Sequence, residues 1–224
     1  MGHVDIPEDY EDRLREGRRA ADRLPEGPAR DTASAALAAA PSREDHARAA
    51  ALAAEASALT GALAEAAFDG TDAGRVAWLR LDFTGRLREL SLSPTIDRLS
   101  NKAVADAIEA AWTAAEAARS EHVLRLERDR AALLAGRVPD PLGDAIRDRV
   151  ARSTAERFAH VTDDDLCAAE VNLEGRLVEL KFLVPNATVD TDCEALAETA
   201  AAVIALVQAR AAERMSEVVA SCLG

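Results

Sequence analysis

The sequence has few aromatic residues: phenylalanine, tryptophan and tyrosine make up 3% of its 224 residues, although hydrophobic residues reach 49%. Much of this hydrophobic content is alanine. Because alanine buries little apolar area, we expect a core that depends on packing between helices more than on large side chains. We interpret Trp78 and Trp112 as core or interface anchors, in preference to base-stacking platforms.

Residues with metal-binding or catalytic chemistry are also few and scattered. The chain has three cysteines without a C-x-x-C motif and four histidines without ligand spacing, which favours reduced thiols in an intracellular protein and predicts no metal site. The run Asp163–Asp165 could attract a cation, but it is more typical of a turn before a strand. Since the sequence carries no P-loop, G-x-S-x-G or G-x-G-x-x-G motif, we expect no cofactor and no enzymatic activity.

Long apolar runs and positive charge are lacking as well. The N-terminus has no apolar segment typical of a signal peptide, and no apolar run approaches about 18 residues, so we expect a soluble, cytoplasmic protein with no membrane partner. The net charge of −13 and the pI near 4.8 act against phosphate binding. A local basic stripe can nevertheless lie on an acidic protein.

An internal repeat organises the rest of the chain. Residues 76–92 read VAWLRLDFTGRLRELSL, and residues 166–182 read LCAAEVNLEGRLVELKF. Both contain GRL-x-EL, both are preceded by apolar alternation, and each is followed by a proline and an alanine-rich helical pattern. Such a repeat indicates one structural unit used twice.

Each copy predicts a helix, a β-hairpin with an optional short third strand, and a long helix. In the first unit, 42–135, we expect a helix over 42–68 after an N-cap at Ser42, strands over 76–83 and 86–92, and a helix from 100 to about 134. In the second unit, 136–224, we expect a helix over 146–158, a second hairpin, and a last helix with a capping box at Thr191. Gly85 and Gly175 should take positive φ in type I turns with a G1 bulge.

The N-terminal region, 1–41, reads as an amphipathic segment over 7–24 and a mobile linker over 25–41. The overall prediction is an α+β fold made of two tandem units, an intrachain pseudo-dimer. We expect the two hairpins to adjoin in one shared sheet.

The run from Arg75 to Glu121 resembles the YbaB/EbfC family of bacterial nucleoid-associated proteins. The family pattern G-x-[VL]-x-x-[VL]-x-[IL]-x-P is matched by Gly85, Leu87, Leu90, Leu92 and Pro94. The second copy keeps Gly175, Leu177 and Leu180, with a displaced proline at Pro185. The resemblance covers most of 42–121 and, more weakly, 146–215. It implies the family fold, a tandem duplication in place of the family's homodimer, and DNA binding with little sequence preference in the nucleoid.

Three functions are open from the sequence, of which a purely structural helical scaffold is the weakest. In the first, the chain binds double-stranded DNA through arginines on the long helices, namely Arg119, Arg125, Arg128, Arg130, Arg210 and Arg214. The acidic residues interleaved with them at helical spacing favour the alternative interpretation, in which these arginines are solvated ion-pair partners. Arg86, Arg88, Arg176 and Lys181 on the hairpins could also face DNA. In the second, the same fold is a protein-interaction module that has lost DNA binding and docks a partner, or a second copy, through its helices.

Overall fold

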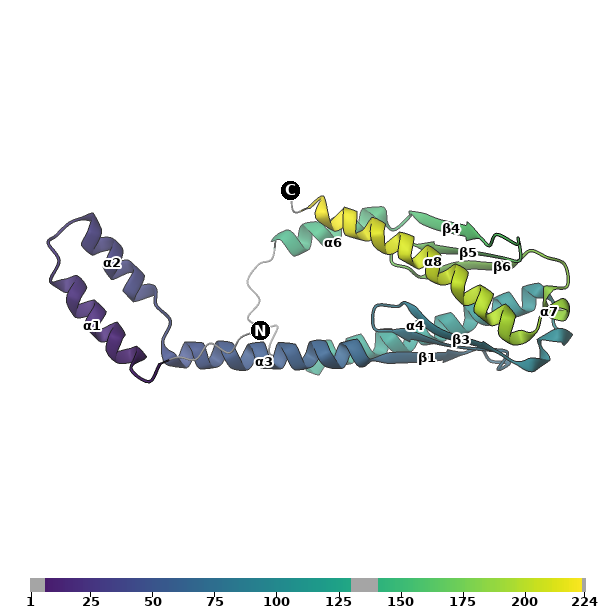
Figure 1. Ribbon diagram of the computed structural model, residues 1–224, viewed down its shortest axis with the longest axis horizontal. Coiled ribbons are helices and arrows are strands. Elements are labelled where there is room, and N and C mark those ends of the chain that lie inside the picture. Colours follow the sequence, from purple (N-terminus) through teal and green to yellow (C-terminus); the bar gives the residue numbers. More distant parts are fainter. Residues whose placement is uncertain (1–6, 130–140, 223–224) are drawn as a thin grey trace. The chain divides into compact units, whose positions relative to one another are not determined.

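The computed structural model describes residues 7–129 and 141–222 (Figure 1). The chain divides into two compact units, the first ending at Leu63 and the second beginning at Ala64. Both copies of the repeat lie in the second unit.

The first unit is helical. It contains α1 (Tyr10–Asp22), α2 (Pro28–Ala39) and most of α3 (Arg43–Glu65). The range 25–41, expected as a linker, therefore contains a helix that packs against α1. Pro28 is the first residue of α2, a position where the missing N–H of proline leaves no helical hydrogen bond unmade. The alanines that follow favour the helix. Ser42 caps α3 as predicted, because its Oγ accepts from Asp45 N at 3.1 Å.

The second unit contains two three-stranded antiparallel sheets. One has the order β1 (Ala67–Thr71), β2 (Ala77–Asp82), β3 (Leu87–Leu92), and the other β4 (Arg157–Val161), β5 (Cys167–Asn172), β6 (Leu177–Phe182). The optional third strand is thus β1 in one copy and β4 in the other. Our placement of Phe68 and Phe158 in helices was wrong, since each lies in one of these strands, opposite Leu81 and Val171 respectively.

Gly70 explains why β1 was hard to predict. In the sequence, this glycine between Asp69 and Thr71 indicates the end of a helix. In the structure it lets β1 approach α4 closely, because a Cβ atom at Gly70 would lie 2.0 Å from Ala111 O and 2.8 Å from Ala115 Cβ.

A long helix follows each sheet. After β3 come a 3₁₀ helix, η1 (Pro94–Arg98), and α4 (Asn101–Asp129). The second copy begins with α6 (Pro141–Ser153) and ends with α7 (Ala187–Asp190) and α8 (Cys193–Ala220). The cap of α8 is Asp192, whose Oδ1 accepts from Ala195 N at 2.8 Å, one residue after the predicted cap at Thr191.

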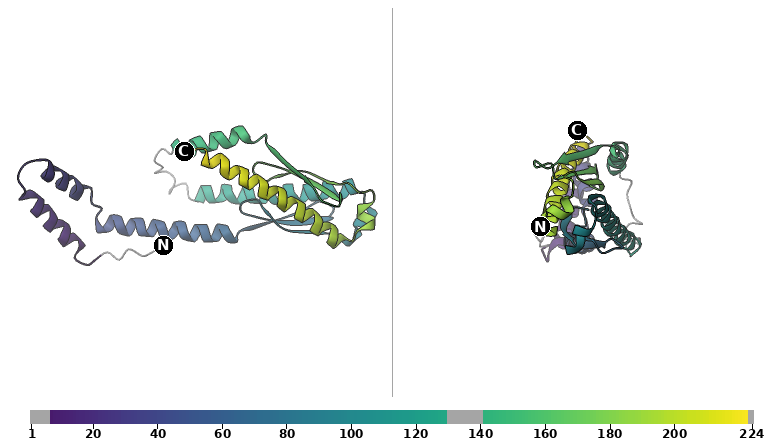
Figure 2. Two further views of the ribbon diagram at one scale, coloured as in Figure 1. Left: turned by 45° about the horizontal axis from the view of Figure 1, so that its top comes forward. Right: turned by 90° about the vertical axis from the view of Figure 1, so that its right-hand side faces the viewer.

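Each long helix packs on both sheets, so the two copies share one core. α4 contacts β1, β2 and β6, while α8 contacts β4, β5 and β3. Figure 2 shows both helices, α4 in teal and α8 in yellow, beside the sheets. The largest fully buried side chains come from both copies and include Leu79, Leu81, Ile108, Val171, Leu196 and Ile204. Trp112 also lies in this core, with 3% of its surface exposed. The fold is therefore α+β with two repeated units, as predicted.

The hairpins do not form the shared sheet that we expected, because helix side chains bind the strand edges that would have paired. Leu87 N in β3 donates to Gln208 Oε1 on α8 at 3.0 Å. Leu180 N in β6 donates to Glu109 Oε1 on α4 at 2.9 Å. Each sheet is thus bound at its inner edge by the long helix of the other copy.

By length and hydropathy alone, α8 could cross a membrane. Its most apolar window is 44% buried, however, and Ile204 and Val207 on this helix are fully buried among the sheets. This is the pattern of a core helix.

Candidate functional site: the cleft between the hairpin tips

The two hairpins turn in the same way, as the repeat predicted. Gly85 and Gly175 have φ angles of 83° and 79°, which residues with a side chain rarely adopt. The residue that opens each turn also accepts a hydrogen bond across it. Asp82 Oδ1 accepts from Arg86 N at 3.0 Å, and Asn172 Oδ1 accepts from Arg176 N at 2.9 Å.

The carboxyl group of Asp82 has a lowered pKa in this turn. Burial alone would raise the pKa of its carboxyl group, but the hydrogen bonds from Thr84 Oγ1 and Arg86 N and the nearby charge of Arg88 outweigh burial, so that the pKa lies below its ordinary value. Arg88 Nη2 lies 2.8 Å from Asp82 Oδ2. Arg88, one of the hairpin arginines, is therefore already neutralised by its own turn.

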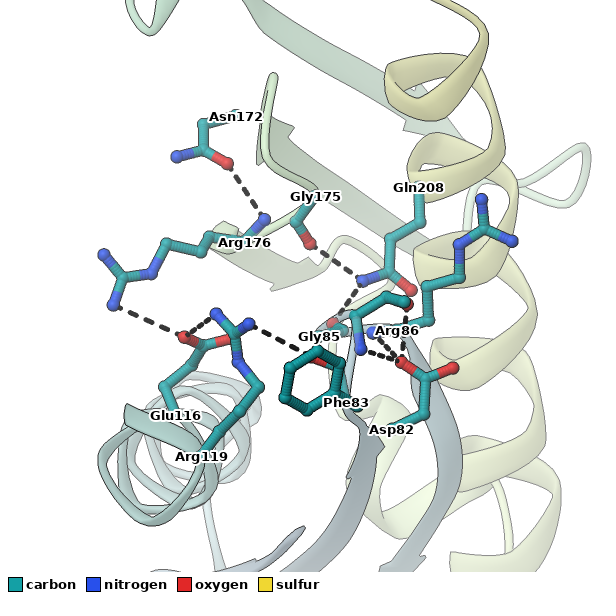
Figure 3. A network of polar contacts seen from close by, with 11 residues as sticks. Asp82, Phe83, Gly85, Arg86, Glu116, Arg119, Asn172, Gly175, Arg176 and Gln208 are labelled. Atoms are coloured by element: carbon teal, nitrogen blue, oxygen red, sulfur yellow. Dashed lines mark hydrogen bonds and ion pairs between the residues drawn. The ribbon is translucent and has the colours of Figure 1, made fainter. Parts of the chain in front are cut away.

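Gln208 on α8 joins the two hairpin tips (Figure 3). Its side chain is buried, and its Nε2 donates to Gly85 O at 3.0 Å and to Gly175 O at 2.8 Å. Together with the bond from Leu87 N, the amide group makes three hydrogen bonds to two hairpins. One side chain thus fixes the spacing of the tips.

Glu116 on α4 occupies the position that corresponds to Gln208. Each follows a stretch of buried residues at the same helical spacing, Ala111, Trp112 and Ala115 in one helix and Val203, Ile204 and Val207 in the other. The Glu116 side chain is 5% exposed, and its Oε2 lies 2.9 Å from Arg119 Nη2 and 3.6 Å from Arg176 Nη2. Arg119 also donates to Phe83 O at 3.2 Å. Glu116 therefore draws one arginine from each copy toward the same point (Figure 3).

These groups surround an open cleft of about 530 Å³, which we call the hairpin-tip cleft. Its polar wall carries arginines from both hairpins and from α4, and its apolar wall comes from the turn after β5 and from α8. The lining residues are Thr84, Arg86, Glu116, Arg119, Ser120, Leu173, Glu174, Gly175, Arg176, Gln208, Ala212 and Met215. Three arginines and two glutamates line the cleft, so it is more basic than the acidic chain as a whole.

Of the expected helix arginines that lie in the described part of the chain, the structure places only Arg119 in this cleft. Arg125 pairs with Glu121 at 2.9 Å, and Arg128 Nε donates to Leu124 O at 3.2 Å. Arg214 pairs with Glu156 at 2.9 Å and Glu217 at 3.1 Å, while Arg210 is exposed on α8. Arg130 lies outside the described residues.

Sequence reasoning missed Glu116 and Gln208. Both interrupt an apolar helix seam with a polar residue, and both do so at corresponding places in the two copies, which is the signal that could have found them. Among residues 7–129 and 141–222, no group of three or more histidine, cysteine, aspartate or glutamate side chains could hold a metal ion. No protein-family model, curated protein or solved structure matches the chain.

Proposed function

We propose that this protein binds double-stranded DNA through its phosphates, without sequence preference, as a nucleoid-associated protein of the YbaB/EbfC type. One observation carries the proposal: Arg86 and Arg176, at matching positions of the two hairpins, line the same cleft together with Arg119. The family resemblance of the hairpins and long helices supports it further. The proposal moves the main contacts from the helix arginines to the hairpin tips.

The binding follows from phosphate chemistry. Arginine guanidinium groups bind phosphate oxygens with charge-assisted, often bidentate hydrogen bonds, and such contacts carry no sequence information. With a net charge of −13, the chain repels DNA at long range. Affinity should therefore be weak. Binding should appear mainly at low ionic strength, because added salt weakens the local contacts between the guanidinium groups and the phosphates.

A titration of labelled random-sequence duplex, followed by fluorescence anisotropy at low and moderate salt, tests the proposal. Replacing Arg86 and Arg176 together with alanine should weaken binding to unrelated duplexes equally and reduce the slope of log K against log salt by about 2. The matched control replaces Arg147 and Arg152 on α6 with alanine. It removes the same amount of positive charge at a site outside the cleft and should lower affinity much less. If the wild type fails to bind even at low salt, the proposal is refuted.

A second candidate function is protein interaction, which α3 favours. Within Arg43–Glu65, no residue is buried, although the helix is rich in alanine and Leu52 is 50% exposed. A helix of this composition needs a packing partner to be stable. Sedimentation of the full chain over a range of concentrations tests self-association, and a monomer at every concentration would remove the second copy as that partner.

A further inference from the structure

Hydrogen-bond donors on either side of Glu116 lack a partner. Trp112 Nε1 and Arg119 Nε are buried atoms with no hydrogen bond to any described residue. The two side chains lie about one turn before and after Glu116, on the same face of α4. Trp112, which is 3% exposed, lines a smaller cavity of about 290 Å³ that shares Glu116 and Arg176 with the hairpin-tip cleft. Because a buried donor without a partner is costly, this arrangement indicates an acceptor that the chain does not supply.

The acceptor at the centre of this arrangement, the carboxylate of Glu116, is bound to Arg119 Nη2 and satisfies neither of the two donors. On α8 the corresponding Gln208 donates to both glycine carbonyls of the tips. A carboxylate at 116 instead accepts from Arg119 and faces Arg176. A DNA phosphodiester, like a carboxylate, offers acceptor-only oxygens that share one negative charge, and inorganic phosphate has more oxygens and a larger charge.

We propose that the hairpin-tip cleft is a binding site for a single phosphate group and that the Glu116 carboxylate competes with this phosphate for Arg119 and Arg176. The inference rests on the proposed function, since it names the group that the cleft receives and the residue that limits its affinity. The phosphate can belong to a DNA backbone or to a free phosphate ion, and the two sources are separated by experiment.

The key variant is Glu116→Gln, which removes the competing charge and places at 116 the residue that the other copy carries at the corresponding position. Removing one negative charge a few ångströms from a bound phosphate should tighten its binding about tenfold. The matched control is Glu198→Gln on the exposed face of α8, which changes the net charge equally and should alter affinity less than about twofold.

Two arms measure the effect on the full-length protein. The first titrates random-sequence duplex at low salt. The second measures the thermal midpoint in inorganic phosphate against sodium chloride of equal ionic strength, because a ligand that binds only the folded state raises the midpoint. Support requires Glu116→Gln to gain about tenfold in DNA affinity and to show a larger phosphate-specific rise than the wild type and the control, with Arg176→Ala reversing both gains.

Other results overturn the inference in distinguishable ways. Equal behaviour of Glu116→Gln and Glu198→Gln would refute the competition, whether or not the wild type binds DNA. A gain for DNA without a phosphate-specific rise in the midpoint would refute the discrete phosphate site while leaving the proposed function intact. If Glu116→Gln does not fold, the test compares the phosphate-specific rise in thermal midpoint of the wild type with that of Arg176→Ala. An equal rise in the two proteins would also refute the phosphate site.

Discussion

Gln208 provides the sharpest prediction about how the two copies are held together. Replacing it with leucine keeps the approximate volume but removes an acceptor from Leu87 N and a donor from Gly85 O and Gly175 O. A buried backbone group that loses its partner costs about 1–3 kcal/mol, although water in the open cleft can bind the two carbonyls in part. We therefore expect Gln208→Leu to lower the free energy of unfolding by about 3 kcal/mol.

Glutamate at the same position gives a second, pH-dependent test. Gln208→Glu keeps the acceptor for Leu87 N but directs a carboxylate oxygen toward two carbonyl oxygens, which raises the pKa of the new carboxyl group in the folded state. Because its folded pKa is raised, the variant should be most destabilised at neutral pH and should recover stability relative to the wild type as the pH falls and the carboxyl group becomes protonated.

Urea unfolding followed by tryptophan fluorescence measures both effects, since Trp78 and Trp112 both lie in the second unit. The exposed substitution Glu213→Ala on α8 is the control and should change the free energy of unfolding by less than about 0.5 kcal/mol. If Gln208→Leu were as stable as this control, the bridge between the hairpin tips would contribute nothing and the reasoning would fail.

Three further predictions concern other parts of the chain. Gly70→Ala should destabilise the second unit by about 2–3 kcal/mol in the same urea assay, because the added Cβ would overlap the α4 backbone. The control Gly61→Ala has open space around it and should not shift the tryptophan-monitored midpoint. Asp82→Asn should lose less stability than the wild type as the pH falls from about 5 to about 2. The lowered pKa of Asp82 contributes stability at pH values above the ordinary carboxyl pKa, and this contribution is lost as the pH falls through the folded pKa, so equal acid sensitivity of the two proteins would contradict the prediction. Deleting residues 1–40 should leave the tryptophan-monitored midpoint nearly unchanged, because these residues belong to the first unit; a large drop would show that they stabilise the second.

The sequence predicted those parts of the fold that depend on local chemistry. The tight turns were predictable because a glycine with positive φ follows an aspartate or asparagine at a fixed spacing. The long helices were predictable from apolar positions such as Val104, Ile108 and Ala111, which recur at helical spacing and are buried. In both cases neighbouring residues alone determine the structure.

The remaining features depend on contacts between distant residues. β1 was unclear because Gly70 indicates a helix end unless its approach to α4 is known. The separation of the two sheets follows from Gln208 and Glu109, whose partners lie far away in the sequence. Among the predicted helix arginines that the structure describes, only Arg119 reaches the hairpin-tip cleft. Arg125 pairs with Glu121 one turn away on the same helix, an alternative that the sequence offered, whereas Arg214 pairs with Glu156, which lies far away in the sequence.

The most direct test of DNA binding at the hairpin tips is a map of amide chemical shifts in isotopically labelled protein, titrated with a random-sequence duplex at low salt. The predicted result is a set of shifts centred on the turns at Gly85 and Gly175 and on the turn of α4 around Glu116, with little change in β4 or α6. Shifts confined to β4, α6 or the first unit, or no shifts at all, would contradict the proposed function.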